Sequence, residues 1–357
     1  MKPFFTQKLL EWNNKENTRS MPWKGEQDPY KIWLSEIILQ QTRVEQGWDY
    51  YLRFVKAFPT VHKLAVAPEA TVFKLWEGLG YYSRCKNLIT SAKMIDQSYN
   101  GSFPTTYESI LALKGVGPYT AAAIASFAFN LPHAVVDGNV ARIIARVFGI
   151  ETPIDSTTGK YIINDLAAEL LDKKKPGVYN QAIMDFGAVI CKPQVPLCEA
   201  CIMQSKCIAF KKGLVQLLPV KEKKIVKKNR WFYYLIITHK KQVYIKKRSG
   251  KDIWQNLYEF FLVENDKALN VEEIQQHQYV KPLFKQNKAT ITSVSRAYSQ
   301  QLTHQTLHGM FIELIVSSAP QLGEDFIKVA FEDLEQYPFP KFIITYLQEK
   351  NVNLSQR

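Results

Sequence analysis

The feature that most constrains this chain is a group of four cysteines at Cys191, Cys198, Cys201 and Cys207. Their spacing is Cys-x6-Cys-x2-Cys-x5-Cys, which contains one close pair and two longer steps. Four thiolates this near in sequence can converge on one centre, either zinc or an iron–sulfur cluster. Structural zinc usually takes two close pairs, so the spacing favours a [4Fe–4S] cluster and leaves zinc as the alternative.

The use of cysteine also indicates the compartment. The chain has five cysteines, and the fifth, Cys85, lies in a helical pattern that predicts an ordinary small core residue. Clustered thiols are more typical of a reducing compartment than of a secreted protein held by disulfides. No N-terminal apolar stretch is long enough for a signal peptide or a membrane span, because the chain turns polar at residues 11–17. We therefore expect a cytoplasmic protein with no membrane partner.

A basic stretch divides the chain into two predicted domains. Residues 211–230 carry eight lysines and arginines against the single acid Glu222, which predicts an exposed linker. Residues 1–210 show apolar side chains at helical spacing and predict an all-α domain. Residues 231–357 contain β-rich runs and end in a predicted helix, so we expect an α+β domain there. The runs "RWFYYLIIT" and "QVYIKKR" are joined by the polar "HKK", which predicts a hairpin. The formal net charge of +13 is compatible with a polyanionic partner.

A glycine-containing step in the helical part, "LKGVGPYTAAAIA", has the features of a phosphate site. Gly115 and Gly117 permit a turn with open backbone amides, and the helix that follows places its N-terminus beside them. This is the hairpin of a helix-hairpin-helix element. The alternative is a tight connection between two helices without a ligand.

Two carboxylates are candidates for catalysis. Glu36 shares a helical face with Trp33 and Leu39, an apolar setting that raises the pKa of a carboxyl and keeps its proton available. Asp137 precedes a predicted helix, where an N-cap is at least as well supported by the local sequence as catalysis. The commoner role of a helical glutamate such as Glu36 is a salt bridge. One carboxylic acid that donates a proton and a second that stays ionised would suit cleavage of a glycosidic bond.

Several motifs in register resemble one family. The strings "WLSEIILQQT", "GLGYYSRCKNL", "LKGVGPYTAAAIASFAF" and "VVDGNVARI" precede the cysteines in the order typical of MutY-type adenine DNA glycosylases of the helix-hairpin-helix superfamily. The resemblance covers nearly all of residues 4–210. It implies a two-lobed helical domain in which residues 191–207 bind a [4Fe–4S] cluster of mainly structural role, with Lys206 as a phosphate contact.

The resemblance implies roles for individual residues. Glu36 corresponds to the acid that protonates adenine N7. Asp137 corresponds to the carboxylate that faces the anomeric carbon and either stabilises the sugar cation or bonds to it transiently. Tyr119 and Asn139 correspond to their helpers, and Arg19 to a residue lining the adenine pocket.

DNA contacts are implied in the same way. Gln41 and Tyr81 correspond to residues that enter the base stack while adenine is flipped out, and Gly115 and Gly117 to the phosphate-binding hairpin. The endonuclease III branch has a Schiff-base lysine where this chain has Tyr119. A phenol cannot form an imine, so we expect a monofunctional glycosylase.

The C-terminal part resembles the Nudix-like recognition domain of the same family. Residues 254–260, "WQNLYEF", carry the likeness, and the acidic helix that binds magnesium in Nudix hydrolases is missing. In the family an aromatic–serine–histidine loop inspects 8-oxoguanine, and here Leu302, Thr303 and His304 occupy those positions, with leucine in place of the aromatic.

The sequence therefore predicts a monomeric base-excision enzyme of the bacterial cytosol or nucleoid. Its expected substrate is double-stranded DNA with adenine opposite 8-oxoguanine or guanine. An endonuclease III-like glycosylase for damaged pyrimidines is the nearest alternative, disfavoured by Tyr119 and the extra domain. A catalytically silent damage-binding protein is the other, disfavoured by the presence of both Glu36 and Asp137.

Overall fold

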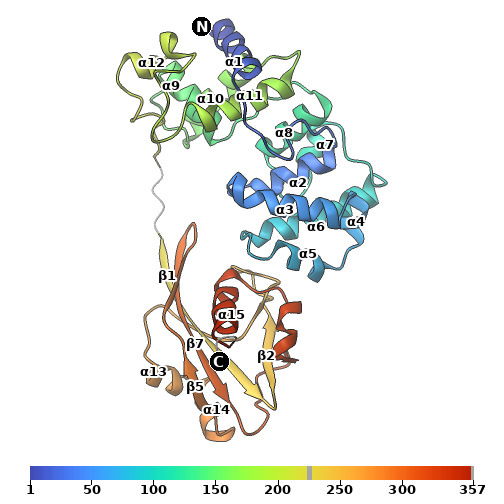
Figure 1. The fold of residues 1–357 in the computed structure, drawn as a ribbon, viewed down its shortest axis with the longest axis vertical. Helices are drawn as coiled ribbons and strands as arrows, with labels where there is room; N and C mark the ends of the chain where they lie inside the picture. Colours follow the sequence, from blue (N-terminus) through green and yellow to red (C-terminus); the bar gives the residue numbers. More distant parts are fainter. Residues whose placement is uncertain (223–226, 355–357) are drawn as a thin grey trace. The chain divides into compact units, whose positions relative to one another are not determined.

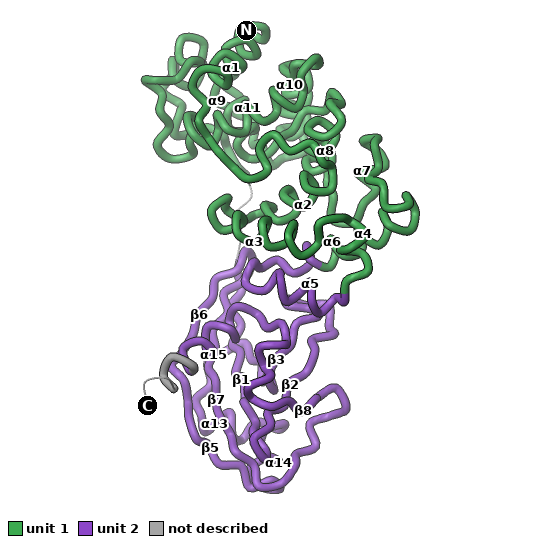
Figure 2. Tube along the Cα trace, turned by 45° about the vertical axis from the view of Figure 1, so that its right-hand side comes forward, with its two compact units in different colours: residues 1–67, 86–223 green, residues 68–85, 224–357 purple. Residues whose placement is uncertain are grey.

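The structure, a computed structural model, describes residues 1–222 and 227–354 (Figure 1). Tertiary contacts group the chain into two units, residues 1–67 with 86–223 and residues 68–85 with 224–357 (Figure 2). Segment 68–85 thus belongs with the C-terminal part, although its helical sequence placed it in the N-terminal domain. Within the second unit the Glu77 carboxylate accepts the Phe339 N–H at 2.9 Å, one of the contacts that attach this segment.

The described part of the first unit contains helices and no strand, which confirms the all-α prediction. The helices are α1 (Lys2–Lys15), α2 (Pro29–Leu39), α3 (Val44–Ala57), α4 (Val61–Val66), α6 (Tyr82–Ser98, its first residues counted with the second unit), α7 (Tyr107–Leu111), α8 (Pro118–Phe129), α9 (Gly138–Phe148), α10 (Thr157–Leu170), α11 (Pro176–Val189), η1 (Gln204–Lys206) and α12 (Ile208–Lys211). Among the described residues of the whole chain, no helix is long and apolar enough to cross a membrane.

Helix α9 is the centre of one lobe of this unit. All of its residues from Val140 to Val147 are buried, and α10, α11 and α12 pack around it. Phe5 and Leu9 of α1 belong to the same core cluster. A helix that is enclosed on every side must satisfy its polar side chains internally. The two buried arginines of α9 do so through backbone carbonyls described below.

The predicted helix-hairpin-helix is present between α7 and α8. Gly115 has φ +78°, and a Cβ there would lie 2.8 Å from the Cβ of Asn87, so both conformation and space require glycine. Gly117 is the N-cap of α8 and provides no side-chain cap, while Pro118 takes the first helical position. The first amides of α8 are therefore left for another acceptor. The α7–α8 hairpin lies beside the candidate site because α8 also packs on α2 and α11.

The second unit is built on an eight-stranded mixed sheet. Its path is β3-β2-β1-β7-β5, with β4 paired to β1, β6 to β7 and β8 to β2; β1 and β7 are parallel and the other pairs are antiparallel. The strands are β1 (Lys228–His239), β2 (Gln242–Lys247), β3 (Tyr258–Glu259), β4 (Phe261–Asn265), β5 (Thr290–Val294), β6 (Tyr298–Gln301), β7 (Gln305–Ile315) and β8 (Phe326–Ala330). Its helices are α5 (Glu69–Trp76), α13 (Val271–Gln276), α14 (Lys281–Gln286), η2 (Phe331–Gln336) and α15 (Lys341–Leu354).

Alternation along β1 gives the sheet two apolar faces. Tyr233, Leu235 and Ile237 point to the side of α13 and α14, with which they form one core cluster. Phe232 and Tyr234 take part in an aromatic cluster that includes Phe342 of α15. The predicted β1–β2 hairpin is confirmed, and both of its turn residues, Lys240 and Lys241, have positive φ. Between β2 and β3 the described chain forms turns and no helix.

Candidate active site

Glu36 lies on α2 and is almost fully enclosed, with 6% of its surface exposed. Asp28 caps the N-terminus of this helix by accepting the Tyr30 N–H, and Pro29 occupies its first position. Burial raises the pKa of Glu36 to about 7, and the nearby Asp137 carboxylate adds to the rise. The local sequence had suggested this direction from the apolar face of the helix. The alternative role, a salt-bridged glutamate on the helix surface, does not fit a side chain that is this deeply buried.

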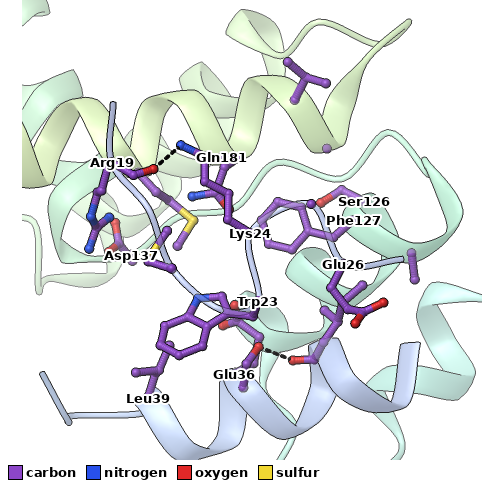
Figure 3. Close-up of a pocket in the computed structure, with 18 of the residues that line it drawn as sticks. Arg19, Trp23, Lys24, Glu26, Glu36, Leu39, Ser126, Phe127, Asp137 and Gln181 are labelled. Carbon is purple, nitrogen blue, oxygen red and sulfur yellow. Dashed lines mark hydrogen bonds between the residues drawn. The ribbon is translucent and has the colours of Figure 1, made fainter. Parts of the chain in front are cut away.

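A cavity of about 680 Å³ opens beside Glu36. Figure 3 shows Arg19, Trp23, Glu36 and Asp137 gathered around it. The residues of the predicted catalytic set that line it are Glu36, Tyr119, Asp137 and Asn139, together with the predicted adenine contact Arg19. These side chains come from α2, α8, α9 and the chain before α2. Tertiary packing thus brings all five into one cavity.

Asp137 is both the N-cap of α9 and a wall of the cavity. Its carboxylate accepts the Val140 N–H at 2.7 Å and the Asn139 side-chain amide at 2.9 Å. Burial raises the pKa of Asp137, while these hydrogen bonds and the Arg142 charge oppose the rise. The sequence left two roles open for Asp137, a helix N-cap and a catalytic carboxylate. The geometry is compatible with both roles at once.

Tyr119 is hydrogen-bonded to Glu36. Its phenol lies in the first turn of α8, directly after the hairpin, and donates to the Glu36 carboxylate. Burial together with the Glu36 and Asp137 charges raises the pKa of Tyr119 well above its usual value. The phenol therefore stays protonated and remains a donor between the two acids.

A fully buried carboxylate, Asp185 of α11, holds one wall of this cavity. It accepts hydrogen bonds from Arg19 at 2.8 Å, Asn17 at 2.9 Å, and Lys24 and Gln181 at 3.0 Å. Three of these donors, Arg19, Lys24 and Gln181, line the cavity. Sequence reasoning missed Asp185, Lys24 and Gln181, because only the convergence of α11 with the segment before α2 reveals their connection.

Two predicted DNA-stacking residues have left-handed backbone conformations. Gln41 follows α2 with φ +57°, and Tyr81 precedes α6 with φ +46°. Non-glycine residues rarely adopt positive φ, and such strain is often found at functional sites. Both side chains are exposed. Nothing in the local sequence indicated the strain.

The four cysteines of the 191–207 loop line one small cavity together with Arg146. Within residues 1–222 and 227–354, no three His, Cys, Asp or Glu side chains form a group that could hold a single metal ion. Four thiols around one cavity are the donor set of a four-iron cluster, which takes a cysteine on each iron, and also of a structural zinc. The four cysteines fit a cluster because thiolates are its usual ligands and because all four line the same cavity. Cys85 is fully buried, as predicted for a core residue.

Arginines of α9 connect the cysteine loop to the candidate site. Arg142 donates to the carbonyl of Cys191 at 2.9 Å and to the Asn139 side chain at 2.8 Å. Arg146 donates to the carbonyls of Lys192 and Pro193, at 2.6 and 2.9 Å. These bonds satisfy buried guanidinium groups and attach the start of the loop to α9. Lys206, the predicted phosphate contact, is exposed in η1 of the same loop.

The predicted lesion-contacting residues lie at the tip of the β6–β7 hairpin. Leu302 donates its N–H to the Gln305 carbonyl at 2.8 Å, which closes the turn. Thr303 is half-buried and His304 is exposed. His308, which follows on β7, stacks on Trp231 with ring centroids 5.0 Å apart. This contact is a packing interaction within the sheet.

The fold and site define a class, the helix-hairpin-helix DNA glycosylases of base excision repair. Residues 34–166 match the family model described as "HhH-GPD superfamily base excision DNA repair protein", and residues 232–349 match the NUDIX domain. A thermostable thymine-DNA glycosylase has a similar structure, with a TM-score of 0.55 and 31% identity over 59% of this chain and 97% of its own. An endonuclease III–DNA complex, at a TM-score of 0.51 and 19% identity over 60% of this chain and 98% of its own, supports the fold alone.

The curated relatives narrow the class. "Adenine DNA glycosylase" of Buchnera aphidicola subsp. Baizongia pistaciae is 36% identical over 73% of this chain and 75% of its own length. The protein of that name from Buchnera aphidicola subsp. Schizaphis graminum is 37% identical, over 72% and 74%. The human protein of that name is 41% identical over 57% of this chain and 39% of its own. The chain belongs to the adenine DNA glycosylase family and is a DNA glycosylase.

The Asp185 contacts generate a prediction for stability. Asp185→Asn keeps the shape of the side chain but leaves Arg19 and Lys24 without their buried counter-charge. We expect the free energy of unfolding, measured by urea denaturation, to fall by about 3 kcal/mol. The matched control is Asp165→Asn, an exposed aspartate on α10, which should change it by less than about 0.5 kcal/mol. Equal values for the two variants would contradict a structural role for the Asp185 charge.

The raised pKa of Glu36 predicts that this residue destabilises the fold at alkaline pH. The folded protein retains the proton between pH 4.5 and about 7, where the unfolded chain has lost it, so stability falls as pH rises through that range. The difference corresponds to about 3 kcal/mol. Glu36→Gln should therefore be more stable than the wild type near pH ~8 and similar near pH ~4. Glu45→Gln, at an exposed position on α3, should follow the wild type at both values.

Proposed function

We propose that this enzyme hydrolyses the N-glycosidic bond of adenine mispaired with 8-oxoguanine or guanine in double-stranded DNA. The observation that carries the proposal is one cavity lined by Glu36, Tyr119 and Asp137. Glu36 is largely buried, has a pKa of about 7 and is hydrogen-bonded to Tyr119. A carboxyl that titrates near neutral pH is suited to general acid catalysis. The names of the relatives support adenine as the base that is released.

The two acids have different tasks because their surroundings differ. Glu36 is enclosed and keeps its proton, which it gives to N7 of the flipped adenine so that a neutral base departs. Asp137 accepts hydrogen bonds from Val140 and Asn139, which favour its ionised form. Its negative charge faces the anomeric carbon and stabilises the oxocarbenium-like sugar, and Glu36 then activates water.

Other residues of the cavity bind and orient the base. Tyr119 donates to Glu36 and holds its carboxyl toward the leaving group. Arg19, Lys24 and Gln181, placed by Asp185, provide polar contacts to the adenine edge. Since Tyr119 occupies the position of the Schiff-base lysine, the enzyme is monofunctional and leaves the abasic strand intact.

DNA is held by groups outside the cavity. The open amides of the Gly115–Gly117 hairpin and the exposed Lys206 contact phosphates, and Gln41 and Tyr81 support the stack from which adenine is flipped. Thr303 and His304 contact the opposite base, with Leu302 replacing the aromatic contact. The enzyme works as a monomer in the cytosol or nucleoid, where its DNA substrate is found.

The four cysteines Cys191, Cys198, Cys201 and Cys207 would hold a [4Fe–4S] cluster. The bound cluster supplies a cross-link that stabilises the loop, without a part in the reaction at the base. Arg146 fixes the start of this loop through the Lys192 and Pro193 carbonyls, so that Lys206 is presented to the DNA backbone.

The test of the proposed chemistry is base release from defined duplexes. Wild-type enzyme is incubated with adenine opposite 8-oxoguanine, adenine opposite guanine, and thymine glycol, and strands are scored with and without alkali. We expect release from the two adenine duplexes, with strand breaks only after alkali. Glu36→Gln should lower the single-turnover rate by about a hundredfold or more while DNA binding persists, because no proton can be transferred. Asp137→Asn should act similarly, and Glu45→Gln should match the wild type.

Each contrary result has a definite meaning. Near-normal release by Glu36→Gln would exclude Glu36 as the acid. Release from thymine glycol in place of adenine would favour the endonuclease III-like alternative. Tight binding of all duplexes without release would favour the damage-binding alternative.

The cluster has its own test. Purified protein should be brown and contain about four irons per chain. Cys198→Ser should lose colour and iron, whereas Cys85→Ala, which changes a buried cysteine outside the loop, should keep both. Colourless wild-type protein with a single zinc would overturn the cluster.

A further inference from the structure

A groove in the second unit takes no part in the proposed reaction. It has a volume of about 370 Å³ and lies between α5, η2 and α15, all of which belong to this unit. None of its residues lines the cavity that contains Glu36. The apolar part of its lining consists of Phe331, Leu334, Phe339, Ile344 and Leu347.

Contacts within the unit hold the walls of the groove in place. The Phe339 ring stacks on Phe260 with centroids 5.5 Å apart, and the Phe339 N–H donates to the Glu77 carboxylate at 2.9 Å. Glu77 also accepts a hydrogen bond from Lys74 of α5 at 2.7 Å. Leu334 of η2 is buried, with 4% of its surface exposed. The groove is therefore formed before a ligand binds, which lowers the entropic cost of binding.

The charges that line the groove are unbalanced. Lys74 forms an ion pair with Glu77, so that these two charges offset each other. Glu332 and Glu335 lie three positions apart in the 3₁₀ helix η2, where residues at this spacing share one side. Both are exposed, and within residues 1–222 and 227–354 neither carboxylate takes part in a hydrogen bond or an ion pair. The groove thus combines an apolar lining with uncompensated negative charge, and we name it the acidic groove.

One aromatic ring of the acidic groove already contacts a cation. The Lys350 ammonium lies 4.9 Å from the centroid of the Phe331 ring, and it is paired with the Glu313 carboxylate. Because Lys350 has this partner, its charge does not compensate Glu332 or Glu335. The contact also shows that an ammonium group fits beside the apolar surface of Phe331, where the ring attracts positive charge.

The acidic groove and its lining select the chemistry of a ligand. DNA is a polyanion and is repelled by the two glutamates, although the formal net charge of the whole chain is +13. Carboxylates without partners attract lysine or arginine side chains. An apolar lining favours leucine or phenylalanine side chains, which gain free energy when they leave water. A protein segment that carries both kinds of side chain matches both parts of the groove.

We propose that the acidic groove binds a segment of another protein in which leucine or phenylalanine is flanked by lysine or arginine. Phe331, Ile344 and Leu347 are only partly buried and receive the apolar side chains, whereas Glu332 and Glu335 pair with the cations. The inference goes beyond the proposed function, because it gives the enzyme a protein partner in addition to its DNA. Since the groove shares no residue with the Glu36 cavity, adenine release does not depend on this segment.

The experiment measures binding of a fluorescein-labelled synthetic peptide to the full-length enzyme by fluorescence anisotropy. The peptide has leucine or phenylalanine at every third or fourth position and lysine elsewhere, which places its apolar side chains on one helical face. We expect saturable one-to-one binding that weakens as the salt concentration rises. A peptide with serine at the apolar positions should bind at least about tenfold more weakly, because it buries no large apolar side chain. A peptide with glutamate in place of lysine should not bind.

Variants of the enzyme locate the binding site. Glu332→Gln combined with Glu335→Gln keeps the shape of both side chains and should weaken binding about fivefold, as expected for the loss of two exposed ion pairs. The matched control combines Glu272→Gln with Glu324→Gln, at two exposed positions of the same unit outside the acidic groove, and should bind like the wild type. Both double variants should release adenine opposite 8-oxoguanine at the wild-type rate, so a failure of the proposed function would be seen separately.

Other outcomes would overturn the inference. Equal binding by the wild type and the Glu332→Gln, Glu335→Gln variant would place the peptide elsewhere on the enzyme. Absence of binding to the wild type, or equal binding of the serine peptide, would mean that the groove does not recognise this chemistry. A dimer of the enzyme that is seen by analytical ultracentrifugation and lost in Glu332→Lys with Glu335→Lys would make the groove an interface between copies of this chain, which is also contrary to the inference.

Discussion

Burial of the Glu36 carboxyl, which raises its pKa to about 7, is the constraint around which the helical unit is organised. A proton donor can be kept at neutral pH only where water does not solvate its ionised form. Helix α2 supplies the apolar surroundings, and α8 and α9 bring Tyr119 and Asp137 to the same cavity. The helices therefore hold an energetically unfavourable group, whose desolvation opposes stability and suits the general acid that we propose.

Charged side chains offset the cost of burying Glu36, because they form hydrogen bonds that connect separate segments to α9 and α11. Asp185 joins the segment before α2 to the cavity wall, and Arg142 joins the cysteine loop to Asn139, which itself bonds Asp137. Each of these buried groups has several partners, as isolated buried charges would be too costly. The cysteine loop and the candidate acids are thus parts of one hydrogen-bonded framework, so the loop can influence the acids by position without entering the reaction.

The second unit solves a different problem, the placement of a short polar tip on a rigid support. Its sheet has apolar side chains on both faces, covered by α13 and α14 on one and α15 on the other. The β6–β7 hairpin extends from this core and carries Thr303 to the Tyr81 hydroxyl. A rigid sheet gives the tip a defined position, which the proposed contact with the opposite base requires.

Local sequence determined the features that depend on neighbours in the chain. Cysteine spacing, the left-handed turn at Gly115, the apolar face around Glu36 and the β1–β2 hairpin are all consequences of short-range geometry and periodicity. The parallel pairing of β1 with β7, the four donors around Asp185 and the bond between Tyr81 and Thr303 were decided by tertiary structure alone. These contacts join residues far apart in the chain, and a single sequence carries no periodic signal for which distant groups will meet. Packing of whole elements selects the partners.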